Sequence, residues 1–539
     1  MLGIHDGHDS GAAIIDGNEI NAVNEERLNR QKYFRGFPTK SVKEVIRLSA
    51  LDASEIDKVA TAGIYRNKKR LLKLKRNLNE ILGDMDIITV HHHDAHAAGA
   101  YFTSGWRNCV VLTIDAAGDG LSSAVYLGED GELKRIAESS YLDSLGDFYA
   151  SITEMLGFVP MRHEGKVMAL AAYYNDEEYY DFSDCIEVDG LNFDNHLEVT
   201  GSDSVKKLSE KTDFPLHRKE ECLNVLRKGK KDHELWNEAT KIASSAQKHL
   251  ENMLNQLCKN IKGCDGIGDE LKETICFSGG VAQNVKANKI LRKNFQNSYI
   301  FPHMGDGGLA LGAALYVNSK FNEEKIHWNW NKTLKNVLLG PRFTSKQIES
   351  FLKEKERLKW EKVEDEPNLI SDMLKDGKLV GIFQGKMEYG PRALGNRSII
   401  ADPSKLELKK ELNEKLGRES FQPFSPTILE EYKDKYLENP SSNKFMTMSF
   451  DITERAEEEL IGAIHVDGTC RSQILEKKDN ETFHAIIKRF EEKTGIGAVL
   501  NTSFNLHGYP IVCTPEEAID SMKKIGLDAL LCCDHIIRD

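Results

Sequence analysis

The chain has 539 residues, ten cysteines and a formal net charge of −13. This length exceeds what one ordinary hydrophobic core organises, so we expect two or more domains. The acidic balance argues against nucleic acid as a partner, and no apolar run reaches the roughly 18 to 20 residues that cross a membrane.

The first residues and the cysteines indicate the compartment in which the protein works. The first residues lack the basic-then-apolar order of a signal peptide. The cysteines have no Cys-x-x-Cys spacing, and Cys532 and Cys533 are adjacent. We therefore expect reduced thiols in a cytoplasmic protein.

Residues 2–24 predict a β-hairpin in which the segments LGIH, AAIID and EINAVN are separated by polar turns. The first turn, DGHDSG, offers backbone N–H groups between strands and could cradle an anion. His8 in this turn could be a general base, with Asp9 and Ser10 beside it. An ordinary tight turn is the alternative.

A helix over 41–51 and a strand near 58–62 are expected next, and the basic run 66–76 is more typical of a solvated helix face. The segment HHHDAHAAGAY (91–101) then has the densest cluster of possible metal ligands. Helical residues four apart share a face, so His92 and His96 can bind one ion, with His93 and His96 a poorer choice. Surface or core histidines are the alternative.

Residues 108–126 predict a buried strand, a Gly-rich turn and a return strand, as in the first hairpin. Two such halves indicate an internally duplicated domain with a nucleotide held between them. Asp115, expected at the strand end, could bind a metal or face a phosphate. Residues 145–175 look helical, 176–235 look like an insertion, and a long amphipathic helix is expected over 234–262.

Two further Gly-rich turns follow. Residues 274–291 predict strand, turn and helix, where Gly279 and Gly280 allow close approach of a phosphate or nucleotide sugar to the helix N-terminus. Residues 301–315 predict a strand, an aspartate among glycines and a tightly packed helix, so Asp306 is a natural fourth metal ligand. Two histidines with two aspartates favour Fe(II) or Mn(II) over a structural zinc.

The polar stretch 320–342 predicts a domain boundary, and a second α/β domain is expected after it. Its main segment, VGIFQGKMEYGPRALGNRSIIADP (380–403), is a strand that runs into a basic loop. Several arginines in Gly/Pro-rich loops suit phosphate recognition better than a solvated surface. The candidate cations and neutral donors are Lys386, Arg392, Arg397, Lys415, Arg418, Arg471, Asn501, Ser503 and Asn505.

Motifs along nearly the whole chain resemble the carbamoyltransferase family that includes the nodulation-factor and antibiotic O-carbamoyltransferases. They are GIHDGHDSGAA, HHHDAHAA, HEGKVMALAAY, FSGGVAQN and MEYGPRALGNRS. The resemblance implies an α/β fold with a duplicated, Kae1-like domain of the actin/Hsp70/sugar-kinase type over 1–328. A linker over 329–342 and a YrdC-like α/β domain over 343–539 complete it.

The resemblance also implies a reaction in two steps. The YrdC-like domain makes carbamoyl adenylate and pyrophosphate from carbamoyl phosphate and ATP. The Kae1-like domain then moves the carbamoyl group to a hydroxyl of a small acceptor beside a divalent metal, Fe(II) or Mn(II), while Mg(II) accompanies ATP. Neither nucleic acid nor a membrane is an expected partner.

Site residues follow from the same motifs. The resemblance implies catalytic His8 and Asp9; metal ligands His92, His96, Asp115 and Asp306; nucleotide contacts Ser10, Ser278, Gly279, Gly280 and Asn284; and contacts to carbamoyl phosphate or ATP from Lys386, Arg392, Arg418, Arg471, Asn501 and Ser503.

Two positions depart from the family pattern. Gln422 in FQPFSP stands where an arginine is usual, and Leu416 stands where a lysine is usual. Either Lys415, Lys386 or Arg397 compensates for the missing charges, or carbamoyl phosphate binds more weakly.

Three alternatives stay open: a sugar-kinase-like phosphotransferase, a tRNA-modifying enzyme of the threonylcarbamoyl type, and a nucleotide sensor without turnover. The acidic balance counts against the second. The sequence specifies neither the acceptor nor the oligomeric state.

Overall fold

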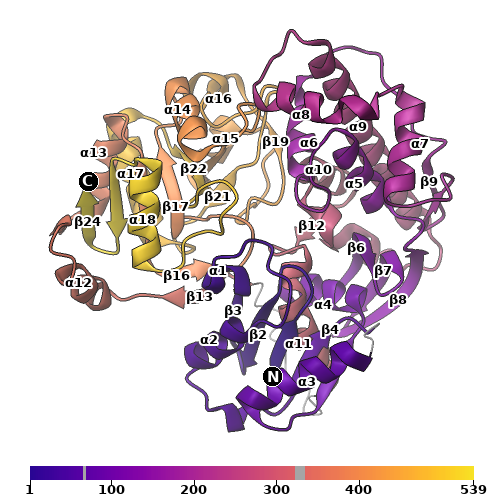
Figure 1. Ribbon diagram of the computed structural model, residues 1–539, viewed down its shortest axis with the longest axis horizontal. Helices are drawn as coiled ribbons and strands as arrows, with labels where there is room; N and C mark the ends of the chain where they lie inside the picture. The colour runs from indigo at the N-terminus through magenta and orange to yellow at the C-terminus, as the bar shows by residue number, and fades with distance from the viewer. Residues whose placement is uncertain (65–67, 322–333, 539) are drawn as a thin grey trace. The chain divides into compact units, whose positions relative to one another are not determined.

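The computed structural model describes residues 1–64, 68–321 and 334–538. The chain divides into two compact units (Figure 1). The first contains Met1–Ile20 and Arg35–Leu334, and the second contains Asn21–Phe34 and Lys335–Asp539. The second unit is thus built from two separate stretches of chain. Of the expected linker, residues 329–333 lie outside the described residues.

Two five-stranded sheets organise the first unit, and they share one topology. The orders are β3-β2-β1-β4-β5 and β8-β7-β6-β11-β12. In each, the first strand along the chain pairs antiparallel with the second and parallel with the fourth. The expected internal duplication is therefore confirmed. The strands are β1 (Leu2–His5), β2 (Gly11–Asp16), β3 (Glu19–Asn24), β4 (Val59–Ala62), β5 (Ile87–Val90), β6 (Asn108–Gly118), β7 (Leu121–Glu129), β8 (Glu132–Ser140), β11 (Thr274–Ser278) and β12 (Asn297–Ile300).

Two helices rich in small residues pack on these sheets and on each other. Helix α4 (His92–Ser104) packs against β6 and β11, and α11 (Leu309–Phe321) packs against β1 and β4. A Cβ atom at Gly312 would lie 2.0 Å from the carbonyl oxygen of Ala95, so only glycine permits this approach of α11 to α4. The small residues that the sequence places there serve close helix packing.

Helices outside the sheets complete the first unit. The predicted long helix is α9 (Glu234–Gly263), against which α5, α6 and α10 pack. The insertion over 176–235 has structure of its own, with two strands and two helices. The elements are α2 (Thr39–Ser49), α3 (Lys68–Leu82), α5 (Leu145–Met155), α6 (Glu164–Leu170), β9 (Ile186–Asp189), β10 (Asn192–Asn195), α7 (Ser202–Thr212), α8 (Lys219–Arg227) and α10 (Val285–Asn294).

Two details of the prediction were wrong. The strand expected from residue 301 lies earlier, because β12 ends at Ile300 and Pro302 has no N–H to continue the ladder. Asp115 lies inside β6 rather than at its end. The pairing of β6 with β7 shifts register between Ile114 and Gly118, and such an irregularity re-aims side chains.

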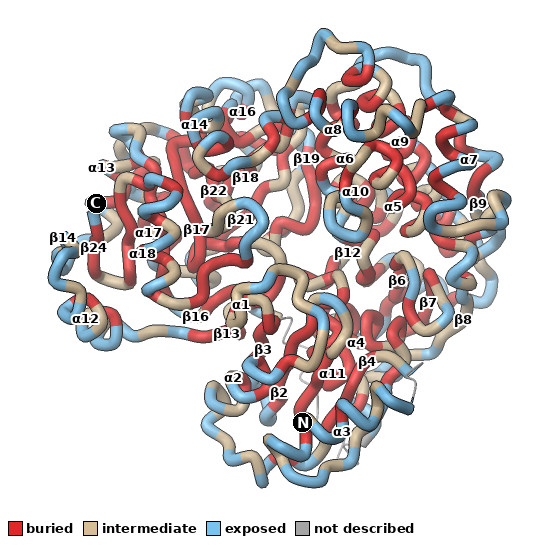
Figure 2. The backbone as a smooth tube through the Cα atoms, in the orientation of Figure 1, coloured by how far each residue is buried: buried red, intermediate tan, exposed pale blue. Residues whose placement is uncertain are grey.

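The second unit has an eight-stranded mixed sheet of order β14-β24-β23-β15-β17-β22-β18-β21. Its strands alternate between two cores. Val380 and Ile382 pack in one core with α13 and α17, while Leu379 and Phe383 pack in the other with α12, α14 and α18. The buried strands between exposed helix faces are visible in Figure 2. Helices therefore cover both faces, and the α/β class is confirmed.

The bounds of these elements are as follows. The strands of the sheet are β14 (Lys359–Lys362), β15 (Val380–Phe383), β17 (Arg397–Ala401), β18 (Ser425–Leu429), β21 (Gln473–Leu475), β22 (Ala498–Ser503), β23 (Ala529–Cys532) and β24 (His535–Arg538). Two short ladders join β13 (Leu338–Arg342) to β16 (Lys386–Glu388) and β19 (Phe450–Asp451) to β20 (Thr469–Cys470). The helices are α1 (Glu25–Asn29), α12 (Ser345–Lys353), α13 (Glu366–Lys375), α14 (Leu406–Leu416), α15 (Lys433–Tyr436), α16 (Glu454–Glu459), α17 (Glu481–Thr494) and α18 (Pro515–Ile525). Among the described residues, no helix is both long and apolar enough to cross a bilayer.

Candidate active sites in the two units

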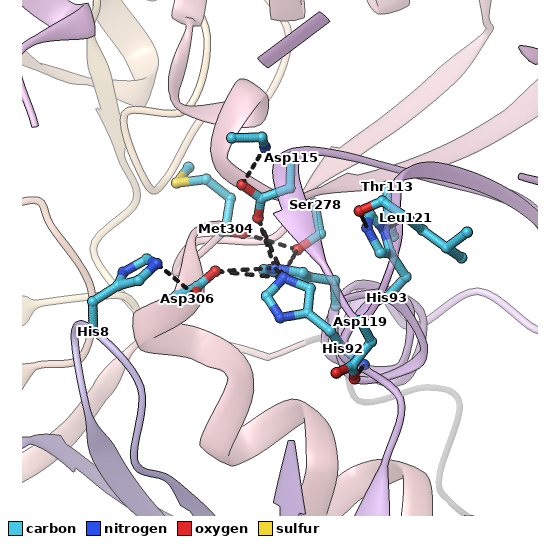
Figure 3. A network of polar contacts seen from close by, with 12 residues as sticks. His8, His92, His93, Thr113, Asp115, Asp119, Leu121, Ser278, Met304 and Asp306 are labelled. Atoms are coloured by element: carbon cyan, nitrogen blue, oxygen red, sulfur yellow. Dashed lines mark hydrogen bonds and ion pairs between the residues drawn. The ribbon is translucent and has the colours of Figure 1, made fainter. Parts of the chain in front are cut away.

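Four predicted metal ligands converge at the N-terminal end of α4 (Figure 3). His92 and His96 lie one turn apart on this helix, Asp115 extends from β6, and Asp306 lies in the turn before α11. One ligand atom from each lies within 4.8 Å of the others. All four side chains are buried.

The spacing of these atoms tests whether they fit one cation. The two imidazole Nε2 atoms are 3.1 Å apart. Asp115 Oδ2 lies 3.1 Å from His96 Nε2 and 3.5 Å from His92 Nε2, and Asp306 Oδ1 lies 3.5 Å and 3.6 Å from the same atoms. Ligand atoms that share an ion at about 2.1 Å are expected about 3.0 to 3.4 Å apart. The arrangement therefore fits a divalent cation.

Electrostatics also favour positive charge here. Burial alone would raise the pKa of Asp115, yet His92 and His96 hold it well below its usual range. Burial would likewise lower the pKa of His96, but Asp115 and Asp306 raise it to about 9. The two buried carboxylates thus stay ionised only beside a cationic group, whether an imidazolium or a bound ion.

Neighbouring groups orient the ligand histidines. Ser278 Oγ donates to the Met304 carbonyl (3.1 Å) and lies 3.3 Å from His96 Nδ1. Asp119 Oδ2 accepts the backbone N–H of His92 at 2.8 Å. Asp119 was not among the predicted site residues, although an aspartate in the Gly-rich turn after β6 resembles the predicted ligand positions. The hydroxyl of Ser278 is buried and contacts His96, which favours an orienting role, and its nucleotide contact stays a prediction.

His93 does not belong to the cluster. Its Nδ1 lies 2.8 Å from Thr113 Oγ1 and its Nε2 lies 3.3 Å from the Leu121 carbonyl (Figure 3). Burial lowers its pKa well below the usual range. The alternative prediction, in which His93 and His96 bind one ion, is therefore wrong. His92 and His96, four residues apart, are the pair that converges.

His8 lies beside the cluster, in the turn between β1 and β2. Its Nε2 is 3.0 Å from Asp306 Oδ2, and its Nδ1 is 3.1 Å from Asp9 Oδ2. Asp306 and Asp9 raise the pKa of His8 to about 9, so in this arrangement it is a cation near neutral pH. Ser10 Oγ is buried and makes no hydrogen bond with the described residues.

The turn at 278–284 approaches the cluster closely. Gly279 has φ +99°, and a Cβ atom there would lie 2.2 Å from the Ile114 carbonyl oxygen. At Gly280 a Cβ atom would lie 2.9 Å from Asp115 Oδ1. Both glycines are therefore needed for the backbone to pass next to β6.

Asn284 is the N-cap of α10. Its Oδ1 accepts the backbone N–H of Ala287 at 3.0 Å, and its amide exchanges two hydrogen bonds with Gln247, at 2.8 Å and 3.1 Å. These contacts give Asn284 a structural role as a helix-capping residue. A nucleotide contact by Asn284 would require its amide to leave them.

Replacing Gly279 with Ala is expected to destabilise the protein by about 3 kcal/mol, because the new methyl group meets the Ile114 carbonyl and φ is positive. Gly263, at the end of α9, has open space around its Cβ position, so Gly263→Ala should leave stability nearly unchanged. Thermal and urea unfolding of both variants measure this. Equal stability of the two variants would contradict the close approach.

Three of the predicted arginines form a cluster of positive charge in the second unit. Arg418 Nε donates to Gln422 Oε1 at 3.0 Å, and Arg471 donates to Ser425 Oγ at 2.9 Å and 3.1 Å. The Nε of Arg392 is buried and makes no hydrogen bond with the described residues. Among those residues, no carboxylate forms an ion pair with any of the three.

The three guanidinium groups act on one another electrostatically, and each side chain is only partly exposed. Burial lowers the pKa of Arg392 to about 10, and that of Arg418 to about 10 against a smaller opposing effect of Glu419. Burial lowers the pKa of Arg471 well below the usual range, and the charges of Arg392 and Arg418 add to this. Three partly desolvated, mutually repelling guanidinium groups are stabilised when an anion binds among them.

The loop that carries Arg392 is anchored on both sides. Glu388 Oε1 accepts the backbone N–H groups of Leu394, Asn396 and Arg397. Asn501 Nδ2 donates to the Ala393 carbonyl at 3.2 Å. Asn501, predicted as a substrate contact, thus positions the arginine loop through its amide nitrogen.

The other predicted contacts are placed as follows. Lys386 Nζ donates to Asn21 Oδ1 at 3.3 Å. Ser503 ends β22, partly exposed, in register with Ser398 of β17.

Family models of the carbamoyltransferase N-terminus match residues 1–75 and 60–315, and a model of the carbamoyltransferase C-terminus matches residues 371–539. An uncharacterized protein of Methanocaldococcus jannaschii is 39% identical over 100% of this chain and 99% of its own length. The nodulation protein NolNO of Sinorhizobium fredii is 30% identical over 98% of this chain and 79% of NolNO. The chain belongs to the carbamoyltransferase family.

Among solved structures, HypF of T. kodakarensis is similar to this carbamoyltransferase with a TM-score of 0.37 and 13% identity. The similarity covers 60% of this chain and 48% of HypF.

The two departures from the usual carbamoyltransferase pattern have structural consequences. Leu416, the last residue of α14, is buried in the hydrophobic core against which that helix packs. Lys415 donates to the Gly526 carbonyl at 2.6 Å and pairs with Glu411 at 2.8 Å, so it does not supply the missing charge in this arrangement. The side-chain oxygen of Gln422 accepts a hydrogen bond from Arg418. Gln422 therefore orients an existing arginine at a position where the family usually has a further arginine.

Arg397 does not compensate either. It is fully buried, donates to the carbonyls of Gln384 and Asn396, and lies over the ring of Phe383 with its Cζ 3.9 Å from the ring centre. Full burial and these Nη contacts make Arg397 a structural arginine, although its Nε makes no hydrogen bond with the described residues. The interpretation of Arg397 as a phosphate contact was wrong, because the motif could not show which side of the strand it occupies.

Proposed function

We propose that this protein is an O-carbamoyltransferase that depends on carbamoyl phosphate and ATP. The second unit makes carbamoyl adenylate, and the first unit transfers the carbamoyl group to a hydroxyl of a small-molecule acceptor. The observation that carries the proposal is the cluster of Arg392, Arg418 and Arg471, in which no guanidinium group forms an ion pair with a carboxylate of the described residues. Carbamoyl phosphate carries about two negative charges and ATP several more, so such a cluster, with Mg(II) on ATP, suits bringing them together.

The metal belongs to the first unit in this proposal. His92, His96, Asp115 and Asp306 hold a divalent ion, and their mixed nitrogen and oxygen donors favour Fe(II) or Mn(II). Such an ion, when bound, acts as a Lewis acid on the carbamoyl carbonyl or a phosphate oxygen. Ser278 and Asp119 keep the two histidines in place.

His8 is the proposed base for transfer. Its positive charge in this arrangement depends on Asp306, 3.0 Å from Nε2. With the charge of Asp306 compensated, the imidazole can be neutral, and its Nε2 can accept the proton of the acceptor hydroxyl. Asp9 then holds the opposite ring nitrogen and fixes the tautomer.

Replacing His8 with Asn is expected to leave pyrophosphate release within about twofold of wild type and to slow carbamoyl transfer by about a hundredfold or more. The reason is that His8 lies in the first unit, whereas the arginine cluster lies in the second. Pyrophosphate and AMP are measured in parallel, since AMP is freed only when the adenylate is consumed. Equal loss of both products would remove His8 from the base role.

The test of the function itself needs no acceptor. Purified protein receives ATP and Mg(II), with or without carbamoyl phosphate, and pyrophosphate is measured. Release that requires carbamoyl phosphate is expected. Release of ADP instead would favour a sugar-kinase-like phosphotransferase, and ATP binding with no release of either product would favour a nucleotide sensor.

A further inference from the structure

The segment Asn21–Phe34 belongs to the second unit although it precedes most of the first unit in the chain. It contributes two arginines that donate to backbone carbonyls of that unit. Arg27 Nη2 donates to the Gly390 carbonyl at 2.9 Å, and Arg30 donates to the carbonyls of Pro510 and Ile511 at 2.9 Å and 2.7 Å. The first contact reaches the loop of Arg392, whereas the second reaches the loop before α18.

Arg27 is held in place for this contact. It lies on α1 with a 6% exposed side chain, and its Nε is 3.4 Å from Glu26 Oε1. Glu26 also accepts the backbone N–H of Tyr33 at 2.9 Å through its other oxygen. The Nη1 of Arg27 is buried and makes no hydrogen bond with the described residues. Burying a cation without a full set of hydrogen-bond acceptors costs free energy of folding, so packing alone does not explain the burial of Arg27.

The contact completes the anchoring of the arginine loop. Glu388 holds the N–H groups after Arg392, Asn501 holds the carbonyl of Ala393, and Arg27 holds the carbonyl two residues before Arg392. Gly390 has φ +139°, a conformation that other residues rarely adopt. Hydrogen bonds to charged groups are stronger than neutral ones, so this donor strongly restrains the start of the loop.

We propose that Arg27 is a positioning residue for the anion site of the second unit: by binding the Gly390 carbonyl it aims Arg392 at the phosphate groups of the substrates. Helix α1, which carries Arg27, is therefore a working part of the adenylate-forming site and not only part of the connection from β3 to α2. This inference rests on the proposed function for its natural ligands, since carbamoyl phosphate and ATP are the anions that the site is proposed to bind.

The experiment uses the full-length protein and three variants: Arg27→Met, Arg27→Lys and, as a matched control, Arg30→Met. Arg30 is on the same segment and also donates to two carbonyls, but away from the arginine loop. Arg27→Met is expected to raise the KM for carbamoyl phosphate by about tenfold or more, with kcat changed far less. Arg27→Lys, which keeps the charge and a donor, should recover part of the affinity, and Arg30→Met should stay within about twofold of wild type.

Binding of inorganic pyrophosphate, measured by calorimetry, separates this inference from the proposed function. If wild type binds pyrophosphate but does not make carbamoyl adenylate, the function fails while the Arg27 comparison still stands. The positioning role is overturned if Arg27→Met binds pyrophosphate as wild type does, if Arg30→Met weakens binding equally, or if wild type does not bind it at all. Should Arg27→Met fail to fold, Arg27→Lys and Arg30→Met give the same comparison, and unchanged affinity in Arg27→Lys beside weaker binding in Arg30→Met overturns the role.

Discussion

Replacing Arg392 with Met is expected to lower carbamoyl phosphate-dependent pyrophosphate release by about a hundredfold or more, since one preorganised donor to a reacting anion is worth that much. Its Nε is buried without a partner among the described residues, and burial lowers its pKa to about 10. The Nε–H group is thus kept from water without an internal hydrogen bond, while the rest of the side chain is partly exposed. An anionic ligand would explain this cost.

The same observation predicts an unusual effect on stability. Because removing a partly buried, uncompensated charge relieves a desolvation penalty, Arg392→Met should melt at the same temperature as wild type or higher in the absence of ligand. Calorimetry measures the melting temperature, and initial rates over a range of carbamoyl phosphate concentrations measure catalysis. Arg538→Met is the control, because Arg538 pairs with Glu361 at the surface. Lower stability together with intact pyrophosphate release would make Arg392 a structural residue.

Replacing Asp306 with Asn is expected to remove the metal and to reduce carbamoyl transfer by about a hundredfold or more, while pyrophosphate release continues. Asp306 Oδ1 faces both ligand histidines, and its Oδ2 lies 3.0 Å from His8. A neutral amide is a weaker ligand for a hard divalent ion than a carboxylate. It also offers His8 no negative charge.

Metal content per folded chain and the ratio of AMP to pyrophosphate together test this prediction. The matched control is His93→Gln, in the same helix but with its ring turned toward Thr113 and Leu121. This variant should keep its metal even if it is less stable. Retention of the metal in Asp306→Asn, or its loss from His93→Gln, would mean that the ligand set is different.

Local patterns in the sequence were sufficient for the parts of the protein that depend on neighbours along the chain. The duplicated strand–turn–strand layout predicted two equivalent sheets, and the spacing of His92 and His96 by one helical turn predicted which imidazoles meet. Asp115 and Asp306 followed from Gly-rich turns beside strands. For the two histidines the helical period determines the direction of the side chains, so few residues carry the information.

Only the tertiary structure decided the roles of polar residues whose partners come from distant parts of the chain. Ser278 faces His96, Asn501 holds the arginine loop, and Arg397 donates from its Nη groups to buried carbonyls. The assignment of segment 21–34 to the second unit, with Arg27 on the Arg392 loop, is of the same kind. A motif specifies which donors and acceptors are present, but burial and long-range packing determine which of them remain available to a ligand.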